Sequence, residues 1–342
     1  MANRGPTLDP NVLTIGDLKD IASKKLPIMY RDYFNEGGMD MITLRDNEDV
    51  YDRYKIRPRV LVNMSHLDVS TTIFGSKVSF PLGFSPAAMH QLAHPDGEVA
   101  TSRAAAKHGV AMAVSSYATC SMEDIITQGS GNPYAFQVTI LKDRVNFADE
   151  WGIGAGYKAI LLTVDCVALG LRINEFRNSF TLPVDVKWPN IESKSKASAT
   201  ATDDDSASYV STPEDVVLAI QYGVDGVIVS NHGGRQLDGV PSTLDSLRDC
   251  APAAAGKIPI AIDGGIRRGS DIFKALALGA SFCFVGRVPI WGLAYNGQEG
   301  VELAIKLLMN EFNITMALAG CKNVSEISKA HLSLLGPALS KL

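Results

Sequence analysis

The sequence predicts an α/β protein of the (β/α)8 or TIM barrel class, with the fifth strand missing or degenerate and with helices ahead of the barrel. Three observations predict this class. From residue 80 onward, short apolar runs alternate with helical segments, which indicates βα units and a parallel sheet. Polar or glycine-rich residues follow most of the runs, at the strand ends where barrels carry active sites. The runs number seven, whereas a complete barrel has about eight strands.

The N-terminal part of the chain predicts helices rather than strands. Thr14 is a good N-cap residue, and Asp17 three positions later strengthens the signature of a helix start. Gly37 and Gly38 predict the end of a second helix. We expect helices at residues 14–26, 28–35 and 46–54. We therefore divide the chain into an N-terminal helical cap region, residues 1–75, and a β/α barrel, residues 76–342.

The barrel region predicts strands and helices in alternation. We expect strands at residues 80–85, 110–116, 135–140, 159–164, 226–229, 258–262 and 282–285. We expect helices at residues 97–108, 121–127, 213–222, 243–250 and 270–278, and two more after the last strand at residues 301–312 and 325–335.

A gap in this pattern falls between Asp165 and Asp225 and is about twice the usual strand spacing. Within it, residues 187–209 are rich in Ser, Lys, Asp and Ala and include three consecutive aspartates. Such a composition does not bury a core, so we predict a disordered loop at residues 187–206. Either the fifth strand is missing, or a poor strand at residues 207–211 closes the barrel.

Composition and charge exclude several classes of function. The net charge of −5 at pH 7 and the pI of about 5.7 argue against a surface for nucleic acid or anionic membranes. The five cysteines are odd in number, widely spaced and without a CxxC pair, which predicts free thiols in a reducing compartment and no metal site. We expect no membrane span and no signal peptide, because no long apolar run and no charged leader are present.

The last three residues, Ser340, Lys341 and Leu342, match an address that the peroxisomal import receptor reads. An accidental match is the alternative, but three specific residues at the required position rarely coincide. We therefore expect a peroxisomal protein with the import receptor among its partners.

The motif at residues 230–238, Ser-Asn-His-Gly-Gly-Arg-Gln-Leu-Asp, directly follows the apolar run 226–229. It places His232 and Arg235 at the C-terminal end of a buried strand. Histidine is the side chain best suited to accept a proton near neutral pH, and a guanidinium binds a carboxylate through two parallel hydrogen bonds. The two glycines let the backbone approach a flat ligand. The alternative is a polar turn with a capping histidine, which the rest of the rim disfavours.

Further polar residues follow the other strands on the same predicted rim. Ser115 ends the second strand, Gln137 lies in the third, and Thr163 and Asp165 end the fourth. Their convergence predicts a ligand with many hydrogen-bonding edges. A glycine-rich motif with an arginine follows each of the last two strands, and either motif alone would be an ordinary turn at the end of a strand. Together, glycines and arginines in the last two βα loops are typical of phosphate sites in barrels. The residues concerned are Asp263, Gly264, Gly265, Arg267, Gly286 and Arg287.

The order of these motifs resembles that of the FMN-dependent 2-hydroxy acid oxidases of the glycolate oxidase type, whose relatives include lactate oxidases and flavocytochrome-type lactate dehydrogenases. The His-Gly-Gly-Arg-Gln-Leu-Asp stretch is highly specific for this family, and the matching segments cover most of the chain in the family order. They are residues 30–33, 57–59, 85–89, 93–98, 115–119, 162–165, 230–238, 263–269 and 274–280.

The resemblance implies a role for each matching residue. It implies His232 as the proton acceptor and Asp165 as the acid that supports it. It implies Tyr33, Arg172 and Arg235 as substrate contacts, with the two arginines on the carboxylate. The implied contacts to the flavin ring and ribityl chain are Pro86, Ala87, Ala88, Ser115, Gln137, Thr163 and Ser230. The implied contacts to the ribityl and phosphate end are Asp263, Gly264, Gly265, Arg267, Gly286 and Arg287.

The chemistry of these residues fits the implied reaction. Oxidation of a 2-hydroxy acid requires a group that holds the carboxylate, a base and an acceptor for two electrons, and no side chain accepts a hydride reversibly. The resemblance therefore implies FMN as cofactor, a small (S)-2-hydroxy acid as substrate, the 2-oxo acid as product, and dioxygen as the electron acceptor that yields hydrogen peroxide. It also implies a homo-oligomer, expected to be a tetramer.

Three departures from the family pattern leave alternatives open. Thr139 stands where the family has a tyrosine that contacts the substrate, and residues 166–172 form a turn with fewer arginines. Ser208 aligns with a family lysine that lies on the fifth strand beside the flavin. The helix before the fifth strand is missing as well, through divergence or a skipped exon. The alternatives are a catalytically impaired FMN-binding homologue, and a related flavin enzyme such as a dehydrogenase with another electron acceptor.

Overall fold

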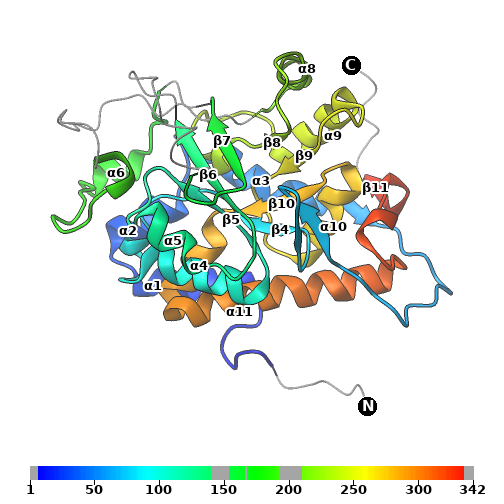
Figure 1. Cartoon of the computed structure of the whole chain (residues 1–342), viewed down its shortest axis with the longest axis horizontal. Helices are drawn as coiled ribbons and strands as arrows, with labels where there is room; N and C mark the ends of the chain where they lie inside the picture. The colour runs from blue at the N-terminus through cyan, green and yellow to red at the C-terminus, as the bar shows by residue number, and fades with distance from the viewer. Residues whose placement is uncertain (1–6, 140–153, 166–167, 193–209, 335–342) are drawn as a thin grey trace.

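The computed structural model describes residues 7–139, 154–165, 168–192 and 210–334. A parallel sheet with helices around it forms the centre of the molecule, and the N-terminal helices lie against it (Figure 1). The strands of this sheet are β4 (Leu82–Phe84), β5 (Ala111–Ser115), β6 (Tyr134–Thr139), β7 (Ala159–Thr163), β8 (Val227–Val229), β9 (Ile260–Ile262) and β10 (Phe282–Val285). Short strands outside it are β1 (Tyr54–Ile56), β2 (Thr71–Ile73), β3 (Ser76–Val78) and β11 (Leu332–Leu334). No helix of the described residues is long and apolar enough to cross a membrane.

The sheet curls so that its first strand in the sequence pairs with its last. The strand order is β7-β6-β5-β4-β10-β9-β8, and all neighbours are parallel. The pairing of β4 with β10, with Leu82 opposite Cys283, is the closing seam of a barrel. The predicted barrel class with a degenerate fifth strand is therefore confirmed.

As far as the structure describes the chain, the barrel is incomplete between β7 and β8, where the fifth strand of a barrel belongs. Within the described residues, β7 pairs only with β6. Val210 forms a parallel bridge with Val229 of β8. Its amide donates to Ile228 O at 3.2 Å, and its carbonyl accepts from the Ser230 amide at 3.3 Å. A remnant of the expected strand 207–211 is thus present at Val210, and residues 207–209 lie outside the described residues.

Helices alternate with the strands, as the sequence predicts. They are α4 (Gly97–His108), α5 (Met122–Ile126), α6 (Ile173–Arg177), α7 (Pro189–Glu192), α8 (Pro213–Gln221), α9 (Thr243–Ala254), α10 (Gly269–Leu278) and α11 (Arg287–Ala319). Short 3-10 turns are η1 (His90–Leu92), η2 (His232–Gly234), η3 (Val324–Glu326) and η4 (Lys329–His331). The expected helix 301–312 is only part of α11, which starts directly after β10 and is kinked where Gly297 adopts a φ of +52°.

The N-terminal helices are α1 (Ile15–Lys25), α2 (Ile28–Asn35) and α3 (Ile42–Arg53). The Thr14 hydroxyl accepts from the Asp17 amide at 3.0 Å, and the Asp17 carboxylate accepts from the Thr14 amide at 2.9 Å, which fixes the predicted start of α1. Helix α3 begins four residues before the predicted 46–54, because the Asp238 carboxylate accepts from the amides of Ile42 and Thr43. Figure 1 shows α1 beside the long helix α11.

One prediction in the C-terminal half is wrong. The expected helix 325–335 is replaced, over its described part, by η3, η4 and the strand β11, because β11 finds an antiparallel partner in β1. Residues 187–192, the start of the predicted disordered loop, contain α7, where Asn190 is buried and bonded to Cys120 O and the Met122 amide. The remainder of that loop, residues 193–206, lies outside the described residues.

Aromatic side chains fill the barrel near the N-terminal ends of its strands. Phe282 and Phe284 lie two residues apart on β10, so they point to the same side of the strand. A Cβ on Gly83 of β4 would lie 3.0 Å from the Phe282 ring and 2.9 Å from the Phe284 ring. Phe74, in the turn between β2 and β3, stacks on Phe284 with ring centroids 6.5 Å apart. This packing leaves the C-terminal rim as the place for a ligand.

Candidate active site

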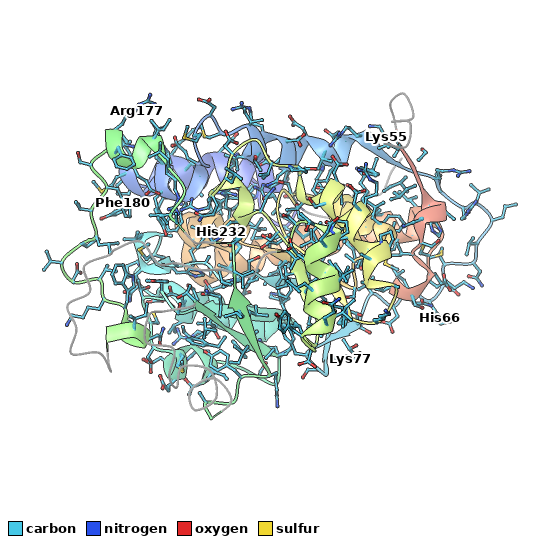
Figure 2. All side chains as sticks on the ribbon, turned by 90° about the horizontal axis from the view of Figure 1, so that it is seen from above. Lys55, His66, Lys77, Arg177, Phe180 and His232 are labelled. Carbon is cyan, nitrogen blue, oxygen red and sulfur yellow. The ribbon has the colours of Figure 1, made fainter. Side chains whose placement is uncertain are left out.

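His232 lies at the C-terminal end of β8 in the turn η2, and Figure 2 shows it near the centre of the molecule. Its φ of +56° is left-handed, a conformation that is uncommon outside glycine and that clusters at functional sites. The Ser230 hydroxyl supports it by accepting from the His232 amide at 3.0 Å. The imidazole Nδ1 lies 3.5 Å from Oδ1 of Asp165. The predicted base and its supporting acid are therefore adjacent.

The N-terminal helices pack directly on the loop that carries His232. Asn47 of α3 and Asn231 exchange two side-chain hydrogen bonds of 2.8 and 2.9 Å. The Gly38 amide donates to Gly234 O at 2.8 Å. A Cβ on Gly234, whose φ is +73°, would lie 2.7 Å from the backbone nitrogen of Leu44. Position 234 therefore requires glycine both for its conformation and for its space.

The two arginines of the predicted carboxylate clamp lie close together, with Arg172 buried and the side chain of Arg235 14% exposed. Arg172 is the N-cap of α6, and Arg235 follows η2. Arg235 donates to the carbonyls of Tyr33 and Glu36, and its guanidinium carbon lies 4.8 Å from the centre of the Tyr33 ring. Oε1 of Glu175 lies 3.0 Å from Nη1 of Arg172 and 3.9 Å from Nη2 of Arg235. Burial, and then the charge of Arg172, lower the pKa of Arg235 to about 10.

A row of buried polar side chains crosses three neighbouring strands. Ser115 of β5 and Gln137 of β6 lie opposite each other in register. Gln137 donates to the Thr163 hydroxyl of β7 at 2.9 Å and accepts from the Ser116 amide at 3.2 Å. Thr139 at the end of β6 lies opposite Thr163, so a small side chain occupies the position of the family tyrosine. The row presents both hydrogen-bond donors and hydrogen-bond acceptors to the mouth of the barrel.

The loop after β4 supplies small, partly exposed residues, namely Pro86, Ala87 and Ala88. Ala87 and Ala88 pack in an apolar cluster that also contains Phe180 and Trp188. Small side chains of this kind let a flat ring lie close to the backbone, as predicted for this segment.

Asp263 ends β9 and is buried at the rim. Its Oδ2 accepts from the Ser85 hydroxyl at 3.0 Å. Burial raises the pKa of the Asp263 carboxyl, and the charge of Asp165 raises it further, whereas hydrogen bonds from Ser230 and Ser85 oppose the rise. Oδ1 of Asp263 is buried without a hydrogen-bond partner. The residue is therefore placed to interact with a further polar group.

The loops after β9 and β10 carry the residues that are predicted for the phosphate end. Gly264 and Gly265 have φ values of +97° and +75°, and a Cβ on Gly265 would lie 1.7 Å from Asn47 O. Arg267 pairs with Glu48 at 2.9 Å and lies over the Trp291 ring at 4.8 Å. The glycines therefore bring this loop into direct contact with α3.

Gly286 and Arg287 connect β10 to α11. A Cβ on Gly286 would have no heavy atom nearer than Ser85 Cβ at 3.8 Å. Arg287 donates to the carbonyls of Phe34, Gly233 and Glu36 at 2.8, 2.9 and 3.0 Å. Burial, and then the charges of Arg235 and Arg267, lower the pKa of Arg287 well below its usual value. Arg287 therefore lies near Arg235 and Arg267 at the barrel mouth, where their positive charges favour an anion.

Buried polar atoms without a hydrogen-bond partner recur at this rim. Such atoms are uncommon and call for a ligand or water. They are Ser116 Oγ, Arg172 Nε, Asp263 Oδ1 and Arg267 Nε. Their distribution, from the carboxylate clamp to the phosphate end, fits an elongated ligand with many polar edges. The residues present therefore fit FMN together with a small carboxylate.

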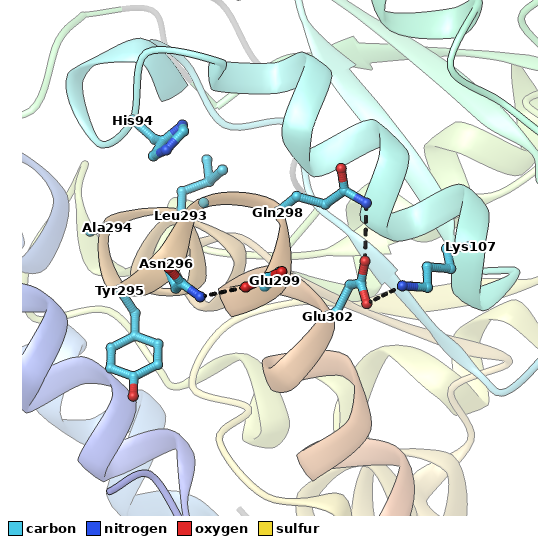
Figure 3. Close-up of a pocket in the computed structure, with 10 residues that line it drawn as sticks. His94, Lys107, Leu293, Ala294, Tyr295, Asn296, Gln298, Glu299 and Glu302 are labelled. Atoms are coloured by element: carbon cyan, nitrogen blue, oxygen red, sulfur yellow. Dashed lines mark hydrogen bonds and ion pairs between the residues drawn. The ribbon is translucent and has the colours of Figure 1, made fainter. Parts of the chain in front are cut away.

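A cavity of about 610 Å³ lies elsewhere, between α4 and α11 (Figure 3). Its charged groups are matched to each other, since Glu302 accepts from Lys107 at 2.7 Å and from Gln298 at 3.0 Å. None of the predicted site residues lines it. We therefore do not place the reaction there.

Sequence reasoning missed several residues that shape the site. Asn47 and Glu48 act on Asn231 and Arg267 from the N-terminal helices, and neither carries a local signal of function. Glu175 was missed as well, although an acidic residue three positions after Arg172 is typical of a helix N-terminus. The contacts of these residues join distant parts of the chain, which a single sequence does not reveal.

Comparison with known proteins agrees with this geometry. The FMN-dependent dehydrogenase family matches residues 22–208 and 209–334. The chain is 48% identical to oxidase FUB9 of Fusarium oxysporum over 358 positions, which cover 95% of this chain and 92% of the relative. That alignment is longer than the 342 residues of this chain, so the relative contains residues that this chain lacks. Glycolate oxidase 3 of Arabidopsis thaliana is 41% identical over 94% of this chain and 96% of its own length.

Solved structures agree with the fold. The crystal structure of a soluble mutant of the membrane-associated (S)-mandelate dehydrogenase from Pseudomonas putida superposes with a TM-score of 0.89 at 30% identity. The match covers 95% of this chain and 100% of that chain. The cofactor of the matching family is FMN, in agreement with the resemblance of the motifs. The chain therefore belongs to the FMN-dependent dehydrogenase family, which includes the 2-hydroxy acid oxidases.

Proposed function

We propose that this protein oxidises a small (S)-2-hydroxy acid to the 2-oxo acid and passes the electrons to dioxygen, which yields hydrogen peroxide. The observation that carries the proposal is the pairing of His232 with Asp165, 3.5 Å apart, together with the buried Arg172 and the partly buried Arg235. A base next to a carboxylate clamp is the arrangement that a 2-hydroxy acid requires. The related glycolate oxidase and (S)-mandelate dehydrogenase support the same substrate class.

The side chains have distinct tasks in this reaction. The guanidinium groups of Arg172 and Arg235 hold the substrate carboxylate and so orient C2 and its hydroxyl. The Asp165 carboxylate faces Nδ1 of His232 and so keeps a proton on that nitrogen. Nε2 of His232 is then the base that takes the substrate proton. Asp165 also stabilises the imidazolium that results. FMN, when bound, supplies the acceptor for the two electrons.

The polar rim and the glycine loops would hold the cofactor. Gln137, Thr163 and the loop after β4 would contact the ring system and ribityl chain. Asp263 and the loops after β9 and β10, with Arg267 and Arg287, would hold the ribityl and phosphate end.

Anaerobic reduction tests this proposal directly. Purified protein reconstituted with FMN is mixed without oxygen with glycolate, lactate or a larger 2-hydroxy acid. We expect the visible absorption of oxidised flavin to bleach, and hydrogen peroxide to appear when air is admitted. A spectrum that no 2-hydroxy acid changes would contradict the proposal.

One alternative has observations in its favour, and a second follows from the resemblance alone. An impaired FMN-binding homologue is favoured by the incomplete fifth strand, of which the described residues show only the Val210 bridge, and by Thr139. A protein that binds FMN but is reduced only after Ser208→Lys would support it, since a cation near the flavin favours the reduced ring. A dehydrogenase with another electron acceptor would bleach without oxygen, give little peroxide in air, and turn over with an artificial acceptor.

The location and assembly are part of the proposal. Residues 340–342 lie outside the described residues, and their match to a peroxisomal address supports import by the peroxisomal receptor. Deletion of these residues from a fluorescent fusion should leave the protein in the cytosol, whereas unchanged location would show that the tail is inert. The resemblance supports a tetramer, which light scattering would distinguish from a monomer of 36.6 kDa.

A further inference from the structure

Glu175 lies between the two arginines that are proposed to hold the substrate. Its Oε1 is 3.0 Å from Nη1 of Arg172 and 3.9 Å from Nη2 of Arg235. The side chain of Glu175 is 19% exposed, and those of Arg172 and Arg235 are 9% and 14% exposed. Two guanidinium groups in such a setting repel each other, so a shared carboxylate stabilises their approach.

The two arginines come from opposite sides of the gap in the barrel. Arg172 follows β7, and Arg235 follows β8. The two loops touch, since a Cβ on Gly170 would lie 2.3 Å from Arg235 O. Within the described residues, no backbone ladder joins β7 to β8. Glu175 is therefore placed to hold the two halves of the clamp together.

The hydrogen bonds of Arg172 leave its Nε–H available to a ligand. Nη1 donates to Glu175, whereas Nε is buried without a hydrogen-bond partner. A buried N–H without an acceptor is costly, so an anionic oxygen at this side of Arg172 would be stabilised. The two arginines and Glu175 together carry one net positive charge. One further carboxylate would neutralise it. The neighbouring Arg287 also carries a positive charge, but it donates to the backbone carbonyls of Phe34, Gly233 and Glu36, so we do not count it as a partner for a second carboxylate.

We propose that Glu175 is a positioning residue that holds Arg172 and Arg235 in register and restricts their anion site to ligands with a single negative charge. The proposal rests on the proposed function, because it assigns these arginines to the substrate carboxylate. It predicts that 2-hydroxy monocarboxylic acids are substrates and that dicarboxylic acids are repelled by Glu175.

Two probes of different charge test the restriction. Oxalate carries two negative charges and pyruvate carries one, and calorimetry measures the binding of both without relying on turnover. Glu175→Gln should strengthen the binding of oxalate relative to pyruvate by about tenfold or more, because a unit charge a few Å away acts strongly at the effective dielectric of about 20 near a protein surface. Glu175→Asp keeps the charge and should keep the ratio of the parent protein.

Flavin reduction tests the positioning. Glu175→Asp withdraws the carboxylate from the arginines, so it should slow anaerobic reduction of the FMN-loaded protein even though the charge is kept. Glu299→Gln is the control, because that carboxylate accepts from Asn296 beside the cavity between α4 and α11, away from the two arginines. It should keep the parent ratio of oxalate to pyruvate binding and the parent rate of reduction.

The outcomes separate this inference from the proposed function. An unchanged oxalate-to-pyruvate ratio in Glu175→Gln would overturn the restriction on charge. Reduction at the parent rate in Glu175→Asp would overturn the positioning role. A shifted ratio in a protein that no 2-hydroxy acid reduces would support the charge restriction and refute the proposed function.

Discussion

Substitution of Gly234 and Gly239 tests how much the contact between α3 and the His232 loop contributes to stability. Both glycines have left-handed backbones, with φ values of +73° and +78°. A Cβ on Gly234 would lie 2.7 Å from the nitrogen and 2.8 Å from the Cα of Leu44, whereas a Cβ on Gly239 would meet nothing within 4 Å. Alanine at the two positions therefore separates the cost of the conformation from the cost of the overlap.

The expected losses in the free energy of unfolding differ accordingly. A left-handed alanine costs about 1–2 kcal/mol at either position. Overlap with the backbone of α3 adds about 1–3 kcal/mol for Gly234→Ala. We expect a loss of about 1–2 kcal/mol for Gly239→Ala and about 2–5 kcal/mol for Gly234→Ala. Gly234→Ala should also displace His232 and slow flavin reduction, because Gly234 and His232 share the turn η2.

Urea unfolding followed by circular dichroism measures both losses, and anaerobic flavin reduction measures the displacement. Gly239→Ala should reduce flavin near the parent rate. Equal losses of stability in the two variants would refute the reasoning, because α3 would then move away from the loop at no cost.

Three further substitutions test single residues of the site. His232→Ala should slow flavin reduction by about 10²–10⁴-fold while FMN absorbance stays with the protein, and reduction at the parent rate would exclude His232 as the base. Arg235→Lys should mainly raise the KM for the 2-hydroxy acid, because an ammonium lacks the bidentate contact, and an unchanged KM would place the carboxylate elsewhere. Burial raises the pKa of Asp263 above 3.8, so its charge destabilises the folded protein at neutral pH. Without FMN, Asp263→Asn should therefore have a larger free energy of unfolding than the parent at neutral pH, and this difference should disappear below about pH 3.8. Urea unfolding at several pH values measures it, and a difference that does not change with pH would contradict the prediction.

Local sequence signals predicted many elements with accurate bounds. The strand β10 and the helices α2 and α4 have the predicted limits, and α1 differs by one residue at each end. The reasons are local, since the Thr14 side chain caps α1 and Gly109 ends α4 with a φ of +62°. Elements of this kind are determined by neighbours in the sequence, which is why one sequence was enough.

Elements that depend on distant residues were missed or misplaced. The start of α3 is set by Asp238, nearly two hundred positions away in the sequence. The C-terminal strand β11 exists because β1 offers its edge, whereas the local pattern favoured a helix. The base and its acid were predicted from motifs, but Glu175 and Asn47 were not, because their contacts arise only when separate loops meet. The missing information is tertiary rather than local.

The gap in the barrel lies between the two strands that supply the predicted base and its acid. Asp165 follows β7, and His232 follows β8. Gln236 joins the two sides, since its amide nitrogen donates to Ala168 O at 2.9 Å and its amide oxygen accepts from the Gly170 amide at 3.1 Å. A side-chain amide that makes one donor and one acceptor contact with a backbone imitates a neighbouring strand. Among the described residues, side-chain links of this kind join the loops that carry His232 and Asp165, where a complete barrel has a backbone ladder. Loss of such a link should therefore affect the rate of reduction before it affects the stability of the fold.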